Sequence, residues 1–413
     1  MTATDFETKL KKYADVVIKV GLNLQPGQRL IIDALVENTA LVHALTERAY
    51  HAGARFVSVL WWDERVDRVM YEKASMESME EAEEWRVAAL VDYMKKGDAV
   101  VIVHNTNPDL AEGIDPQKVG QFQKSWSVNQ KPFRDLRGVL ASNCTIISAP
   151  SSALADKVLP DVPVERRVEK LWELMFGICR VNEDDPVAAW QEHRERLGKR
   201  SNYLNKKTYD ALKFTGPGTD LTVGLPEGHI WNGGSKKTKN GIEMVANIPT
   251  EEVFTIPHRA RIDGKVRATK PLNYMGLADK FSVTFEKGKI VDVSAEVGEA
   301  HLKNIIATDE GSSYIGEIAL VAHSSPISQS GRVFYNILYD ENASCHMAIG
   351  SAYRFSLEGG IDMTDEEFVE SGGNVSAVHA DFMIGSSELD VDGITADGQV
   401  EPVMRAGEFV IGG

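Results

Sequence analysis

His379 and Asp381 stand two residues apart in VHADFMIG (378–385), a short and otherwise apolar segment. Side chains alternate between the two faces of a β-strand, so this pair shares one face and the neighbouring apolar residues share the other. Burying an imidazole and a carboxylate is costly unless both find partners. Three interpretations are open at this point: the face is exposed to solvent, the two side chains satisfy each other, or a third group lies between them.

Three more segments of the second half of the chain carry acids or histidines within apolar or small-residue sequence. They are NIPTEEVFTIPHR (247–259), YIGEIALVAHSSPISQSG (314–331) and LYDENASCHMAIGSAY (338–353). Taken singly, their residues have ordinary explanations. Glu251–Glu252 suits an exposed strand start and Glu317 suits a strand flank. DENAS suits a helix start capped by Asp340 or Asn342, and His346 suits a satisfied core histidine. The residues of the three segments that we consider for chemistry are Glu251, Glu252, Glu317, His323, Asp340, Glu341, His346 and Tyr353.

The combination of these residues points to metal chemistry. Several carboxylates and two histidines in buried-looking sequence are an electrostatic liability unless something neutralises them. Imidazole and carboxylate ligands together suit Zn, Mn, Co or Fe. Two such ions roughly 3.5–4 Å apart activate a water molecule and polarise a carbonyl or phosphoryl oxygen. The sequence therefore predicts a two-metal hydrolase. The alternatives are a phosphoesterase or amidohydrolase of the same type, and a non-catalytic metal- or ligand-binding protein.

The motifs NIPTEEVFT, SPISQSG, LYDENASCH and IGSAY, in this order and spacing, closely resemble the aminopeptidase T / aminopeptidase S / PepS family of dinuclear metallopeptidases. The Pro-Gly start LNLQPGQRLII extends the resemblance over the whole chain. The resemblance implies an exopeptidase that removes N-terminal residues from small peptides with two divalent ions per chain, of Zn, Co, Mn or Mg. The metal ligands that it implies are Glu251, Glu317, His346, Tyr353, His379 and Asp381.

Chemistry suggests roles for some of these residues. Glu317 has two oxygens and is a candidate to bridge the ions. Tyr353 is a weak ligand or a donor to the oxyanion that forms on the scissile carbonyl. Only one of Glu251 and Glu252 faces the site if that stretch is a strand; the motif match selects Glu251, which leaves Glu252 structural or near the water. Glu341 is a candidate general base or extra ligand. The catalytic candidates are Glu317, Tyr353, Glu341 and Glu252.

Two kinds of sequence must position these residues. Apolar strands at 29–34, 55–62, 98–104 and 145–150 alternate with helical stretches, which predicts an α/β N-terminal domain with a mainly parallel sheet. From about residue 207 the sequence is rich in glycine and in strand signals, which predicts an α+β domain with a mostly antiparallel sheet. We therefore expect an N-terminal domain at 1–200 and a C-terminal metal-binding catalytic domain at 201–413.

Charge and composition narrow the partners. Of 413 residues, 45 are Lys or Arg and 61 are Asp or Glu, a net charge of −16, which disfavours binding to nucleic acid or to an anionic membrane. The first residues read as an amphipathic helix rather than a signal peptide, and no apolar run approaches the roughly 20 residues of a membrane span. Three scattered cysteines favour a reducing cytoplasm. The resemblance implies a homodimer with enclosed sites.

Overall fold

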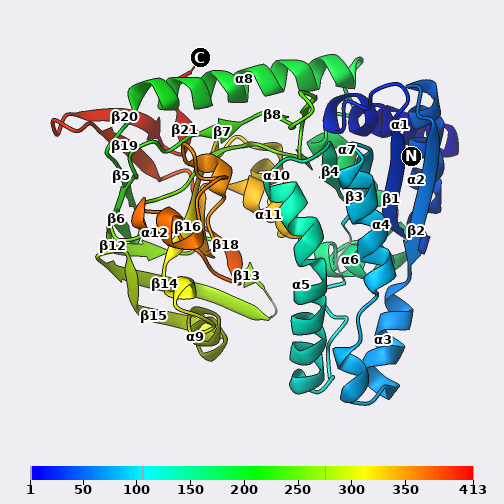
Figure 1. Ribbon diagram of the computed structural model, residues 1–413, viewed down its shortest axis with the longest axis horizontal. Coiled ribbons are helices and arrows are strands. Elements are labelled where there is room, and N and C mark those ends of the chain that lie inside the picture. Colours follow the sequence, from blue (N-terminus) through cyan, green and yellow to red (C-terminus); the bar gives the residue numbers. More distant parts are fainter. Residues whose placement is uncertain (1, 105–106, 275, 413) are drawn as a thin grey trace. The chain divides into compact units, whose positions relative to one another are not determined.

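The computed structural model describes residues 2–104, 107–274 and 276–412 (Figure 1). The chain forms two compact units, Met1–Gln191 with Ser235–Pro249, and Glu192–Gly234 with Thr250–Gly413. The domain limits expected at 1–200 and 201–413 stay a prediction. The residue-200 boundary falls inside α8 (Pro186–Lys207), and segment 235–249 belongs to the first unit because one of its strands joins that unit's sheet.

The first unit is built on a parallel sheet with the strand order β10-β4-β3-β1-β2. Apolar residues run through its central strands because both faces of such a sheet are covered. This confirms the predicted α/β region with a parallel sheet. Its strands are β1 (Arg29–Leu35), β2 (Phe56–Trp62), β3 (Ala99–Val103), β4 (Cys144–Ile147) and β10 (Asn247–Ile248), and a small hairpin adds β8 (Lys236–Lys237) and β9 (Glu243–Met244).

Helices pack on this sheet through apolar faces. Helices α4 and α5 bury Leu90 and Phe133 against Ile31 and Val100 of the sheet, and α2 contacts β1 and β2. Thr2 caps α1 with a reciprocal capping box to Asp5. The helices of this unit are α1 (Ala3–Val16), α2 (Thr39–His51), α3 (Glu64–Lys73), α4 (Glu84–Lys95), α5 (Pro116–Gly138), α6 (Ser152–Val158) and α7 (Val164–Ile178).

The second unit contains two antiparallel sheets, which confirms the predicted class of the C-terminal region. One sheet has the strand order β18-β17-β16-β11-β7. It consists of β7 (Asn232–Gly233), β11 (Glu252–Thr255), β16 (Ile315–Val321), β17 (His346–Gly350) and β18 (His379–Met383). We call it the site sheet. Every residue of β11, β16 and β17 is buried, so any polar side chain on them needs a partner within the protein.

The other sheet of this unit runs β13-β14-β12-β6-β5-β19-β20-β21, with β15 paired to β14. Its strands are β5 (Ala211–Gly216), β6 (Thr219–Gly224), β12 (Ile262–Arg267), β13 (Leu272–Asn273), β14 (Leu277–Glu286), β15 (Lys289–Val297), β19 (Asp390–Ile394), β20 (Val400–Arg405) and β21 (Glu408–Phe409). The short helices are α9 (Glu299–Ile306), α10 (Pro326–Gln329), α11 (Ile337–Asp340) and α12 (Asp365–Glu370).

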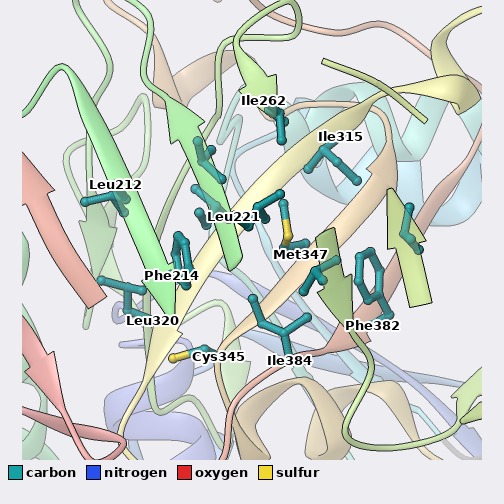
Figure 2. Packing of buried hydrophobic residues seen from close by; sticks show 14 of the residues in the cluster. Leu212, Phe214, Leu221, Ile262, Ile315, Leu320, Cys345, Met347, Phe382 and Ile384 are labelled. Atoms are coloured by element: carbon teal, nitrogen blue, oxygen red, sulfur yellow. The ribbon is translucent and has the colours of Figure 1, made fainter. Parts of the chain in front are cut away.

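One hydrophobic core joins the two sheets of the second unit. Phe214 and Leu221, from β5 and β6, lie in the same buried cluster as Leu320, Met347 and Phe382 of the site sheet, and Figure 2 shows these side chains together. Burying apolar surface contributes about 25 cal/mol per Å², so this core fixes which face of the site sheet is turned inward.

Two expectations from the sequence concern membrane-spanning segments and the three cysteines. Among the described residues, no helix is both long enough and apolar enough to cross a membrane. Cys144, Cys179 and Cys345 are buried free thiols, and burial raises the pKa of the Cys345 thiol to about 12. These cysteines are packing residues rather than reactive ones.

Candidate metal centre

Strand register places the polar residues of the site sheet on one face. Ala348 of β17 lies opposite both Glu317 of β16 and Asp381 of β18, and residues directly opposite each other point to the same face. His346 shares that face, since it is two residues from Ala348, and His379 shares it with Asp381 by the same alternation. The intervening residues point to the hydrophobic core instead. They are Val253, Ile318, Leu320, Met347, Ile349, Ala380 and Phe382.

A β-bulge at Gly316 is what turns Glu317 toward this face. Ile315 pairs with Ile349, whereas Glu317 pairs with Ala348, so the register shifts between them. Without the bulge, Ile315 and Glu317 would point the same way, but Ile315 lies in the core. A Cβ atom at Gly316 would lie 2.2 Å from the Gly350 carbonyl oxygen. Only glycine fits this close approach.

The facing side chains form two groups that share Glu317. Glu252, Glu317 and His346 make one group, and Glu317, His379 and Asp381 make the other. In each group every residue offers one carboxylate oxygen or imidazole nitrogen, and these atoms lie within 4.8 Å of one another. His346 Nε2 lies 3.1 Å from Glu252 Oε2 and 3.9 Å from Glu317 Oε1. His379 Nε2 lies 3.4 Å from Glu317 Oε2 and 3.6 Å from Asp381 Oδ1. Glu317 thus has one oxygen in each group.

The two histidines are oriented as metal ligands usually are. Nδ1 of His346 lies 3.1 Å from the Ser344 carbonyl oxygen, and Nδ1 of His379 lies 2.8 Å from the Ser351 carbonyl oxygen. A carbonyl can only accept, so each Nδ1 is the donor and each neutral ring keeps the lone pair of Nε2 for the site. Such a bond from the far nitrogen fixes the tautomer and the ring orientation of a metal-binding histidine.

Burial makes this cluster fit a divalent cation. The side chains of Glu252, Glu317, His346 and Asp381 are at most 9% exposed, and His379 is 26% exposed. Within the described ranges Glu252 Oε2 has no hydrogen-bond partner of good geometry, which leaves a buried lone pair for another ligand. Three carboxylates and two imidazole nitrogens form the mixed O/N donor set that suits Zn, Mn, Co or Fe.

Without metal, the pKa values of the site residues are shifted by the same excess of negative charge. Burial raises the pKa of Glu317 despite the opposing effect of His379. Burial also opposes charge on the two histidines, but the neighbouring carboxylates outweigh it and raise the pKa of both His346 and His379 to about 10. Protons therefore occupy the cluster when no other cation is there, and a divalent ion can replace them.

The neighbouring glutamates 251 and 252 are separated by the structure. Glu252 belongs to the ligand groups. Glu251 precedes β11; its N–H donates to Asn342 Oδ1 at 2.7 Å, and its Oε2 lies 3.5 Å from Nε2 of His193. His193, from α8, is buried. Nothing in its helical sequence WQEHRER distinguishes it from a surface residue, and sequence analysis missed it.

Tyr353 and Glu341 lie next to the two ligand groups. The Tyr353 ring is centred 5.1 Å from the His379 ring and is 39% exposed, so it stands at the open side of the site. Glu341 accepts a bond from Asn342 Nδ2 at 3.3 Å. Burial, with the charges of Glu252 and Asp381, raises the Glu341 pKa well above its usual range.

The remaining candidates, His323 and Asp340, are not members of the two ligand groups. Nδ1 of His323 lies 3.3 Å from the Ser328 hydroxyl, and His323 is in neither ligand group. Asp340 accepts the backbone N–H of Phe334 and of Asn336. Burial raises its pKa to about 6.

Buried carboxylates and two Nε2-presenting histidines on one sheet face define a metalloenzyme-type centre. The comparisons with known proteins agree with this class. The chain belongs to the thermophilic metalloprotease family (M29), whose model matches residues 6–409. The predicted family resemblance is therefore confirmed, and with it a divalent-metal-dependent peptide hydrolase.

Curated relatives match along the whole chain. Aminopeptidase AmpS of Bacillus subtilis is 44% identical over 98% of this chain and 99% of its own length. Aminopeptidase T of Thermus thermophilus is 42% identical over 98% and 99%, and aminopeptidase PepS of Streptococcus thermophilus is 40% identical over 100% of both. The solved structure of wild-type AmpT from Thermus thermophilus superimposes with a TM-score of 0.93 and covers 98% of this chain and 100% of that one.

Proposed function

We propose that this protein is an aminopeptidase that hydrolyses N-terminal residues from small peptides and uses two divalent ions. The observation that carries the proposal is the pair of ligand groups joined by Glu317. A carboxylate with one oxygen directed into each group suits a bridging ligand between two ions. The relatives named above are aminopeptidases, which favours peptides over other substrates.

The proposed ligands are the five residues of the two groups, with Glu252, Glu317 and His346 at one position and Glu317, His379 and Asp381 at the other. The family resemblance implies Glu251 and Tyr353 as ligands as well. Tyr353 as a ligand stays a prediction. Between the two glutamates the grouping favours Glu252, and variants of Glu251 and Glu252 are the direct test of that choice.

Bound ions would lower the pKa of a water molecule and polarise the scissile carbonyl. The protein's own residues perform the other tasks. Glu341 takes the proton from the attacking water and passes it to the leaving amine, a role that suits a partly buried carboxyl with a raised pKa. The Tyr353 hydroxyl donates to the developing oxyanion from the open side of the site. The Nδ1 bonds of His346 and His379 keep both rings in place.

We also propose that the protein is a cytoplasmic homodimer, as the family resemblance implies. Buried free thiols suit a reducing compartment. Light scattering should give a particle of about twice the 45.5 kDa chain mass. A stable, fully active monomer would contradict the assembly and leave the chemistry unaffected.

The function is tested with aminoacyl p-nitroanilides and p-nitrophenyl phosphate, each assayed before and after chelation. We expect hydrolysis of the anilides only, loss of activity with chelator, and recovery with Zn, Co or Mn. An N-acetylated anilide should not be cleaved. Hydrolysis of the phosphate ester instead, or full activity in rigorously metal-free protein, would refute the proposal.

A further inference from the structure

A small cavity adjoins the site sheet beside Asp381. Asp381 and Met383 of β18 form part of its wall, and Asn336, Ile337 and Asp340 form another part. Its volume is about 20 Å³, and a cavity of roughly 10–15 Å³ can hold one water molecule. The cavity therefore has room for one group of about that size, next to a proposed metal ligand.

Asp340 brings a buried carboxylate to the wall of this cavity. Its side chain is buried, and its two oxygens accept the N–H groups of Phe334 at 2.8 Å and Asn336 at 3.2 Å. Those bonds aim the carboxylate and leave it further lone pairs. In the described part of the chain no basic side chain makes an ion pair with Asp340. The positive charge of Lys270 lowers the Asp340 pKa, but Lys270 does not contact the carboxylate as an ion-pair partner. A buried, unpaired carboxylate is costly, and a cationic ligand would offset that cost.

We propose that Asp340, together with Asp381, binds the α-ammonium group of the substrate in this cavity. The inference rests on the proposed aminopeptidase function, which requires recognition of a free amine. A primary ammonium is compact, carries one positive charge and has three donors. It matches the cavity in size and the two carboxylates in charge and hydrogen bonding. An acylated nitrogen carries no positive charge and is too bulky for the cavity. The cavity therefore accounts for selectivity toward free N-termini.

Binding at this point also positions the reacting bond. The amine nitrogen and the scissile carbonyl carbon are both bonded to one Cα, and these bonds are about 1.5 Å long. An ammonium in the cavity therefore holds the carbonyl beside Asp381, at the ligand group that contains Glu317 and His379. Holding the reacting atoms in place in this way lowers the barrier by removing orientational freedom.

The experiment compares two substrates that differ only in the amine, leucine p-nitroanilide and its des-amino analogue 4-methylpentanoyl p-nitroanilide, on the metal-loaded enzyme. We expect the wild type to prefer the amine strongly in kcat/KM. Asp340→Asn should reduce that preference at least tenfold, mainly by raising KM for the amine substrate. The rate with the des-amino substrate should change much less.

Asp309→Asn is the matched control. Asp309 also accepts backbone N–H groups, from Ser312 at 2.8 Å and Ala377 at 2.7 Å, but it does not line the cavity. Its replacement should lower the melting temperature and leave the substrate ratio unchanged. If Asp340→Asn slows both substrates equally, Asp340 is structural and the inference is overturned. If the metal-loaded wild type cleaves neither substrate, the proposed function itself is refuted, and the inference with it.

A second measurement needs neither a variant nor turnover. The ammonium head of methylammonium fits a water-sized cavity, whereas tetramethylammonium carries the same charge on a much larger ion without donors. Methylammonium chloride should raise the melting temperature of the chelated wild-type protein more than tetramethylammonium chloride at the same concentration. Equal shifts with both salts, or none with either, would overturn the assignment of this cavity to an ammonium group.

Discussion

Replacing Glu317 by Gln should reverse the order of stability between the wild type and the variant when metal is added. The change keeps the shape of the side chain but removes a negative charge that both ligand groups share. Without metal, burial raises the Glu317 pKa. The folded protein therefore favours the protonated carboxyl group. Its contribution to stability is complete below the pKa that Glu317 has in the unfolded chain, and it is lost as the pH rises through the higher pKa of the folded protein. At alkaline pH the chelated Gln variant should be at least as stable as the chelated wild type.

With metal the order should invert. A ligand bound at 100 times its Kd stabilises the fold by about 2.7 kcal/mol. Losing even an outer-shell partner weakens metal binding about 10–100-fold. We take about 100-fold for loss of a direct ligand, which lowers that stabilisation to about 0.4 kcal/mol. For a unit of about 200 residues, the loss corresponds to a melting temperature about 5–9 °C lower than that of the metal-loaded wild type.

The assay is differential scanning calorimetry at pH 8, with chelator and with added Zn, together with measurement of bound metal by mass spectrometry. Glu388→Gln removes an exposed carboxylate from the same unit and should show neither effect. If metal raises the melting temperature of Glu317→Gln as much as that of the wild type, Glu317 is not a ligand and the arrangement of two groups around it is wrong.

Three further predictions follow from the same geometry. Glu252→Gln should lose bound metal, whereas Glu251→Gln should keep most of it; the opposite result in metal analysis would show that the metal-bound protein uses Glu251. The stability of chelated protein should decline as the pH rises from about 7 to 10. The reason is that His346 and His379 have pKa values raised to about 10 and stabilise the fold while they are protonated. A melting temperature that stays constant over this pH range would contradict the raised pKa values. Tyr353→Phe should lower kcat about 100-fold with little change in KM, as expected for loss of an oxyanion donor, and a change confined to KM in steady-state kinetics would count against that role.

The sequence by itself determined the family, the class of both regions and the metal chemistry. Long motifs identify relatives without any structure, and runs of apolar strands alternating with helices indicate a parallel sheet. The shared face of His379 and Asp381 was also readable, since alternation along one strand is a local property of the backbone. Residue types alone were enough to indicate a site for divalent cations.

Tertiary structure decided how separate segments meet. Glu317 faces the site only because a bulge at Gly316 breaks the alternation that places Ile315 in the core, and a bulge depends on pairing with another strand. Whether Glu251 or Glu252 turns toward His346 depends on the register of β11 against β16, which is fixed by contacts distant in sequence. The cavity beside Asp340 exists because α11 packs near the end of β18. The two-residue strand β10 is too short to show any pattern, and only its pairing with β4 assigns segment 235–249 to the first unit.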